Sequence, residues 1–153
     1  MSVAMRRAKQ GGTTTLEFAI CGLVIITIIL AILELSRAMF TLSVLSEGTR
    51  RGARVAAVCT INDPAIATAT TFTSLPGLTS SNVAVEYLDG AGAVIGNPGA
   101  NFGSIDYVRV RIVNYQIQLW IPLISAAFPS PDFAVTLPRE SLGVPRSGTV
   151  DPC

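Results

Sequence analysis

A lone carboxylate, Glu17, stands at the start of the longest apolar run of this 153-residue chain, and the run after it, FAICGLVIITIILAIL, has neither charge nor proline. A charged side chain beside such a run is costly in a membrane, and residues of this kind are usually paired or functional. The nearest upstream cation, Lys9, is eight residues back, beyond two glycines. Peptide-bond cleavage after Gly12 would make Thr13 the first residue. Its new α-amino cation could then neutralise the Glu17 carboxylate of a neighbouring helix.

The apolar run is long enough to cross a membrane. A leucine on either side extends it to roughly 20 residues, and a helix of that length crosses a hydrocarbon core of about 30 Å. Basic residues before an apolar span favour a cytoplasmic N-terminus, although arginines also follow this span. The basic residues before it, with no acid among them, are Arg6, Arg7 and Lys9. We expect a single-pass inner-membrane protein with a periplasmic C-terminal domain.

A cleaved secretory signal peptide is the alternative interpretation of this N-terminus. Such a peptide has an apolar core of about 7–15 residues followed by a small-x-small cleavage site. The core here is longer, and the nearest candidate site is Ser36-Arg37-Ala38. A mature chain that starts at Met39 would exclude a membrane anchor.

The basic leader, Gly12, the glutamate five positions later and the immediate apolar run together resemble the G-x-x-x-x-E pattern of type IV prepilins. Glu17-Phe18 is similar to the Glu-Tyr or Glu-Phe of the Tad (tight adherence) branch. The resemblance implies that a prepilin peptidase cuts after Gly12 and that Glu17 and Phe18 register the helix during assembly. Leader recognition would fall to Arg6, Arg7, Lys9 and Gly12. The alternative is a stray glutamate near a helix start, where the helix dipole favours an acid.

Two further segments extend the resemblance. Glu34-Leu35-Ser36-Arg37 and the stretch from Gly48 to Ala57, GTRRGARVAA, resemble the TadE-like family of minor pilins or pseudopilins. That family typically has a Glu-x-x-Arg and then an Ala-Arg-Glu-Gly-Ala-Arg-x-Ala-Ala-like segment, and here Arg51 stands where glutamate is usual. The similarity covers about residues 6–58. It implies a role in a Flp-type pilus, used in adhesion and biofilms, with the major Flp pilin, sister pseudopilins and the inner-membrane assembly platform as partners.

The helical pattern continues to about Cys59, because no proline occurs before Pro64. Apolar residues from Leu35 to Ala56 recur at three- and four-residue steps, which predicts one stripe that includes Leu35 and Met39 and leaves Thr41 on the other side. Within the stretch, small residues recur four apart at Gly48, Gly52 and Ala56. Such residues permit close helix approach, either against the chain's own sheet or against a helix of another subunit.

The composition after Cys59 shifts to Thr, Ser, Gly and Pro, which predicts a small domain over residues 60–153. Asn62 or Asp63 can cap a helix that begins at Pro64 and ends near Ser74. The expected strands are 83–88, a return through 93–95 after Asp89-Gly90, 107–113 and 133–137. The predicted fold is α+β and pilin-like, with a leader (1–12), a transmembrane helix (13–35), its amphipathic continuation (36–59) and a small antiparallel sheet.

The segment Gln118–Ile124 is apolar but short and broken by a proline. Its length excludes a membrane span. We expect a crossover packed on the sheet; the alternative is a contact with a partner or a membrane surface through Trp120.

Three cysteines are present. Cys21 lies inside the span, where a buried small hydrophobe is the default role. Cys59 and Cys153 lie beyond it, and a bridge between them would contribute about 4–5 kcal/mol in the chain-entropy model. The alternative is two free thiols.

The composition excludes several kinds of function. The chain has no histidine, so it has no Ser-His-Asp triad and no histidine metal cluster. A formal net charge of +1 gives no case for nucleic-acid binding. The acids are dispersed, and Gly90-Ala-Gly92 does not complete a dinucleotide-binding motif. We expect no enzyme activity, no cofactor and no metal. The rival to a pilin-like role is a single-pass anchored envelope domain with a binding or structural role.

Overall fold

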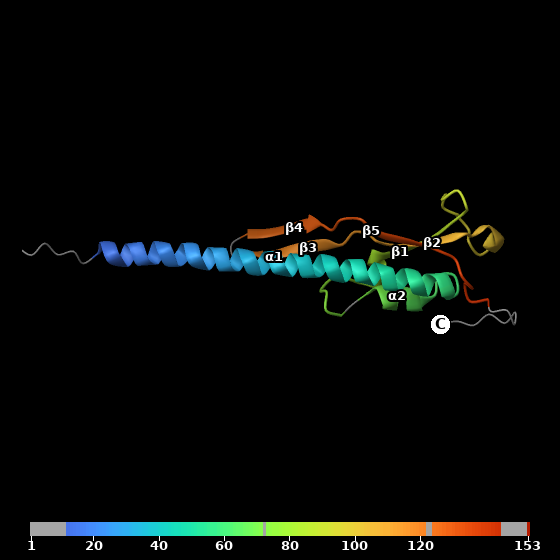
Figure 1. Cartoon of the computed structure of the whole chain (residues 1–153), viewed down its shortest axis with the longest axis horizontal. Helices are drawn as coiled ribbons and strands as arrows, with labels where there is room; N and C mark the ends of the chain where they lie inside the picture. Colours follow the sequence, from blue (N-terminus) through green and yellow to red (C-terminus); the bar gives the residue numbers. More distant parts are fainter. Residues whose placement is uncertain (1–11, 72, 122–123, 145–152) are drawn as a thin grey trace, which may run out of the picture.

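The computed structural model describes residues 12–71, 73–121, 124–144 and 153. A long helix, α1 (Thr13–Val58), runs the length of the molecule, and the remaining elements gather along its second half (Figure 1). They are α2 (Pro64–Thr70), η1 (Ser80–Asn82), β1 (Val83–Leu88), η2 (Phe102–Ser104), β2 (Tyr107–Ile112), β3 (Gln116–Ile121), β4 (Ile124–Pro129) and β5 (Phe133–Pro138). The predicted α+β fold with a long N-terminal helix is confirmed.

Several hydroxyl side chains of α1 donate hydrogen bonds to carbonyls one turn back in the same helix. In the apolar half, Thr27 Oγ1 donates to the Leu23 carbonyl at 2.8 Å. In the domain half, Thr49 is fully buried and its Oγ1 donates to the Leu45 carbonyl at 2.8 Å. A threonine bonded in this way carries no unsatisfied donor into lipid or into a core.

A three-stranded antiparallel sheet, in the order β1-β2-β5, packs against the C-terminal half of α1. In β2 the side chains alternate as predicted, so that Val108, Val110 and Ile112 are buried against the helix. The arginines between them lie on the outer face. There, Arg109 Nε donates to Glu86 Oε2 at 2.6 Å, across the β1–β2 pair.

The strands β3 and β4 continue β2 and β5 without a change of register. Ile112 pairs with Phe133 in the sheet, and Gln116 pairs with Pro129 in the hairpin, so the two pairings keep the same alignment. Between them, the N–H of Ser130 donates to the Tyr115 carbonyl at 2.9 Å. The result is one long antiparallel ribbon beside α1, whose turn end lies toward the apolar half of the helix (Figure 1).

Three predicted elements differ from the structure. The segment 118–124 is no crossover, because its described residues belong to β3 and β4. The return strand over 93–95 is reduced to a single bridge between Leu88 and Val94. The N–H of Ala93, the first residue of this predicted strand, donates to the Asp89 side chain at 2.8 Å. This N–H is therefore bonded within the turn and not to a neighbouring strand. Helix α2 ends four residues early because Thr71 is already extended, at φ −90° and ψ 140°.

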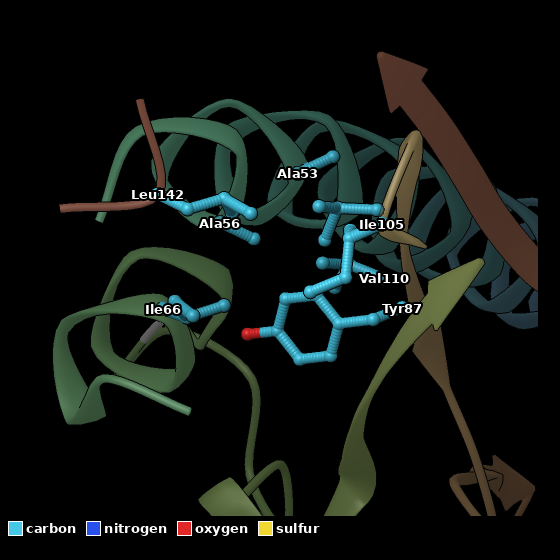
Figure 2. Packing of buried hydrophobic residues seen from close by; sticks show 8 residues of the cluster. Ala53, Ala56, Ile66, Tyr87, Ile105, Val110 and Leu142 are labelled. Carbon is cyan, nitrogen blue, oxygen red and sulfur yellow. The ribbon is translucent and has the colours of Figure 1, made fainter. Parts of the chain in front are cut away.

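The main core lies where α1, α2 and the sheet meet (Figure 2). Tyr87 reaches into it from β1, and its hydroxyl accepts a hydrogen bond from the N–H of Asn62 at 2.9 Å. The ring is therefore buried without an unpaired polar group. The buried residues of this cluster are Ala53, Ala56, Ile66, Tyr87, Ile105, Val108, Val110 and Leu142.

Candidate functional site

The predicted cleavage site lies where the regular helix begins. Gly12 occupies the N-cap position of α1 at φ −119°, and Thr13 is the first helical residue. A Cβ added at Gly12 would meet nothing within 4 Å. Neither packing nor backbone conformation therefore requires glycine at position 12. Recognition by another protein is a reason that would explain a glycine there. The leader residues Arg6, Arg7 and Lys9 lie outside the described residues.

Glu17 and Phe18 lie on the bare N-terminal part of α1. The Glu17 side chain is exposed, and within the described part of the chain it makes no hydrogen bond or ion pair. Phe18 is 80% exposed. The carboxylate and the ring beside it are therefore free to contact lipid or another protein.

The small-residue face of α1 is covered by the protein's own domain. Gly48, Gly52 and Ala56 are all buried. A Cβ at Gly52 would lie 2.0 Å from Oγ1 of Thr70 on α2. Of the two interpretations of this face, the structure shows packing within the chain. The face contacts the sheet, as expected, through Val110 of β2, and it also contacts α2, which glycine at position 52 allows to approach α1 closely.

We expect Gly52→Ala to destabilise the domain by about 1–3 kcal/mol, because overpacking outweighs the roughly 0.5–1 kcal/mol that alanine gains over glycine in a helix. Thr70 cannot turn away freely, since its Oγ1 donates to the Ile66 carbonyl at 2.7 Å. Chemical denaturation of the purified chain measures the loss.

Two variants control this experiment. Gly22→Ala, where an added Cβ meets nothing within 4 Å, should not destabilise the chain. Thr70→Ala in the Gly52→Ala background removes the Oγ1 clash and should recover part of the loss. Equal stability of Gly52→Ala and the wild type would contradict the close-packing argument.

A cluster that the sequence analysis did not assemble ties the ribbon to α1. Glu34 and Arg37 form an ion pair one helical turn apart at 2.5 Å. Glu34 Oε1 also accepts from the backbone N–H of Trp120 at 3.0 Å, and Arg37 donates to the carbonyl of Gln118. The signal in the sequence was the Glu-x-x-Arg spacing, but nothing in it indicated β3 as the partner.

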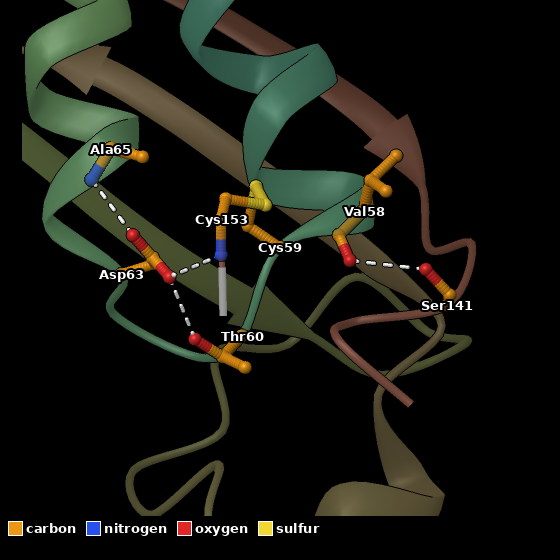
Figure 3. Close-up of a disulfide and its surroundings, with 7 residues drawn as sticks. All are labelled: Val58, Cys59, Thr60, Asp63, Ala65, Ser141 and Cys153. Atoms are coloured by element: carbon orange, nitrogen blue, oxygen red, sulfur yellow. Dashed lines mark hydrogen bonds between the residues drawn. A yellow bond between two sulfur atoms is a disulfide. The ribbon is translucent and has the colours of Figure 1, made fainter. Parts of the chain in front are cut away.

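The end of α1 is fixed by a disulfide between Cys59 and Cys153 (Figure 3). The N–H of Cys153 donates to Asp63 Oδ2 at 3.2 Å, and Thr60 Oγ1 donates to the same oxygen at 2.9 Å. The other oxygen of Asp63 caps α2, as predicted, by accepting from the N–H of Ala65 at 2.9 Å. These donors, the Ala65 N–H first, lower the pKa of the Asp63 carboxyl below its ordinary value.

The segment after β5 closes the same end of the helix. The hydroxyl of Ser141 donates to the Val58 carbonyl at 3.0 Å (Figure 3). The N–H of Gly143 donates to the same carbonyl at 2.6 Å. Gly143 has φ +77°, and a Cβ there would lie 2.3 Å from Thr60 Cγ2. Both the turn and the close approach therefore require glycine.

The described residues hold no group of three or more metal-ligating side chains.

These features define a class of protein. Its described residues contain one helix long and apolar enough to be a membrane anchor, and a disulfide-bonded α+β domain is built on the second half of that helix. Residues 12–54 match the family model described as TadE-like protein. The match confirms the resemblance carried by the motifs and supports a protein associated with the Tad pilus system. Neither the comparison with curated proteins nor the comparison with solved structures gives a match.

Proposed function

We propose that this chain is a minor pilin or pseudopilin of a Tad (Flp-type) pilus, in which α1 is the assembly element. The observation that carries the proposal is the state of the first half of α1. It projects beyond the domain, its large apolar side chains are uncovered, and the carboxylate near its start, Glu17, has no partner among the described residues. The TadE-like match covers this same half and the junction beyond it.

The proposed mechanism begins in the inner membrane, with the leader in the cytoplasm and the domain in the periplasm. A prepilin peptidase recognises the basic leader and Gly12, and hydrolyses the bond between Gly12 and Thr13. The new α-amino group of Thr13 is a cation at neutral pH. When α1 helices pack side by side, this cation neutralises the Glu17 carboxylate of a neighbour and sets the axial register between them.

The chain has no catalytic role in this proposal. Its partners are the peptidase, the major Flp pilin, other pseudopilins and the assembly platform. The same helix contact serves a subunit in the shaft, at the tip or in the assembly machine.

The N-terminus of the mature protein tests the processing step. We expect mass spectrometry of the protein from its native membrane to show a chain that starts at Thr13. Gly12→Leu should retain residues 1–12 and reduce piliation, because the fold tolerates a side chain at position 12 and only the peptidase contact is lost. For the cleavage readout, Gly22→Leu in the span, where a Cβ also meets nothing within 4 Å, is the matched control.

Two outcomes would contradict the proposal. An uncut wild-type chain with normal piliation would favour a single-pass envelope anchor. A chain that starts at Met39 would show that the whole span is removed as a secretory signal.

A further inference from the structure

Hydrogen bonds fix the turn end of the β3–β4 hairpin beside the turn of α1 that contains Glu34 and Arg37. The N–H of Trp120 donates to Glu34, and the guanidinium of Arg37 donates to the carbonyl of Gln118. The same guanidinium lies over the Trp120 ring, 5.0 Å from its centroid. Two backbone contacts and one ring contact therefore place the indole beside the Glu34–Arg37 turn of the helix.

That turn marks the edge of the candidate membrane span. Between Glu17 and Glu34 the helix has no charge. Its large apolar side chains there are uncovered, from 43% exposed at Leu30 to 80% at Phe18. If α1 crosses a membrane, the boundary between acyl chains and headgroups lies near Glu34 and Arg37, because these are the first charges beyond the apolar run.

Trp120 is 71% exposed although it stacks against a cation. An indole has an apolar body and one N–H donor, which suits the headgroup level of a bilayer better than water or the acyl core. On the helix, Met39 and Phe40 are also more than half exposed just beyond the boundary. Exposed aromatic and apolar side chains from two separate elements thus meet at one level.

We propose that the Trp120 end of the β3–β4 hairpin is a membrane-surface contact, with the indole inserted among lipid headgroups beside the outer end of the span. We choose the bilayer as the partner of this surface because the surface is continuous with the uncovered apolar side chains of α1, which face lipid when the helix spans a membrane. Arg37, whose side chain is 36% exposed, is placed to meet lipid phosphates at the same level. The contact gives the domain a second attachment, so that the ribbon and α1 stand together on the membrane. The inference rests on α1 spanning a bilayer and not on the pilus role.

Trp120 is the only tryptophan of the chain, so its fluorescence reports this contact alone. The full chain is reconstituted in vesicles of phosphatidylethanolamine and phosphatidylglycerol that carry bromine, a fluorescence quencher, either near the headgroup or near the chain end. We expect a larger loss of emission with the shallow bromine than with the deep one, and protection from acrylamide in the water. No loss with either lipid, or a larger loss with the deep bromine, would overturn the proposal.

A second chain serves as the matched control. In Trp120→Phe combined with Tyr107→Trp, the indole moves 13 positions along the ribbon, which is about 40 Å at 3.3 Å per residue. Tyr107 is 39% exposed, so a larger ring fits there. This chain should lose no emission to either lipid. Equal quenching of both chains would show a domain lying flat on the bilayer and would overturn the proposal as well.

Discussion

Replacing Cys59 and Cys153 together with alanine is expected to lower the free energy of unfolding of the domain by about 4 kcal/mol. The two cysteines are 94 residues apart. Closing a loop of that size removes roughly 4–5 kcal/mol of conformational entropy from the unfolded chain in the chain-entropy model. Total stabilities are about 5–15 kcal/mol, so this one bond is a large fraction of the whole.

The bridge also keeps local contacts in place. It holds the N–H of Cys153 against Asp63, whose side chain caps α2. Without the bridge, this carboxylate loses one of its donors. We therefore expect the loss to reach α2 and its packing on α1, and not only the end of the long helix.

Denaturant titration in detergent, followed by circular dichroism, measures the effect. A reductant should give the wild type the same loss as the double variant has without it. Cys21→Ala is the control, because Cys21 is a free cysteine on the exposed part of α1 and closes no loop. A midpoint unchanged in the double variant, or unmoved by reductant, would contradict the predicted contribution.

The parts of the fold that the sequence predicted well are those governed by local rules. The alternation in β2 needs only the period of a strand, and the cap at Asp63 needs only a carboxylate before a proline. The length of α1 followed from the absence of proline before Pro64. Each of these features is decided by residues a few positions apart, so a single sequence contains the information.

The features that were missed depend on how distant elements meet. The predicted stripe placed Met39 inside and Thr41 outside, whereas Met39 is 58% exposed and Thr41 is buried. The position of β3 decides which side of the helix is covered, and Thr41 tolerates burial because its hydroxyl donates to the Arg37 carbonyl. The segment Gln118–Ile124 was missed for a different reason: it holds the end of β3 and the start of β4, so it shows neither strand whole.

The candidate site divides in the same way. The motif at Gly12 and Glu17 was found from its spacing together with the basic leader and the apolar run, all of which lie close together in the sequence, and its role in processing and register stays a prediction. The contact of Glu34 with Trp120 joins residues 86 positions apart, and no spacing rule connects them. The small residues at Gly48 and Gly52 permitted two interpretations, which only the position of α2 could separate.

Glu17→Ala is expected to abolish incorporation into the pilus while leaving membrane insertion and leader cleavage intact. In the proposed assembly, the Glu17 carboxylate pairs with the α-amino group of Thr13 on a neighbouring helix. Two unit charges about 4 Å apart attract by roughly 4 kcal/mol at an effective dielectric constant near 20. Each 1.4 kcal/mol is about tenfold in an equilibrium constant, so the loss is of the order of a thousandfold.

The measurement compares the sheared pilus fraction with the membrane fraction by immunoblot, together with the mass of the mature N-terminus. Glu17→Gln keeps the shape of the side chain and removes its charge, so it should fail as Glu17→Ala does if the charge is what matters. Glu47→Ala is the matched control, since Glu47 pairs with Arg51 on the surface of α1 and such exposed pairs contribute little. Normal incorporation of a processed Glu17→Gln chain would exclude charge pairing as the register signal. In the isolated chain the Glu17 carboxylate makes no hydrogen bond or ion pair with any described residue that could offer another explanation.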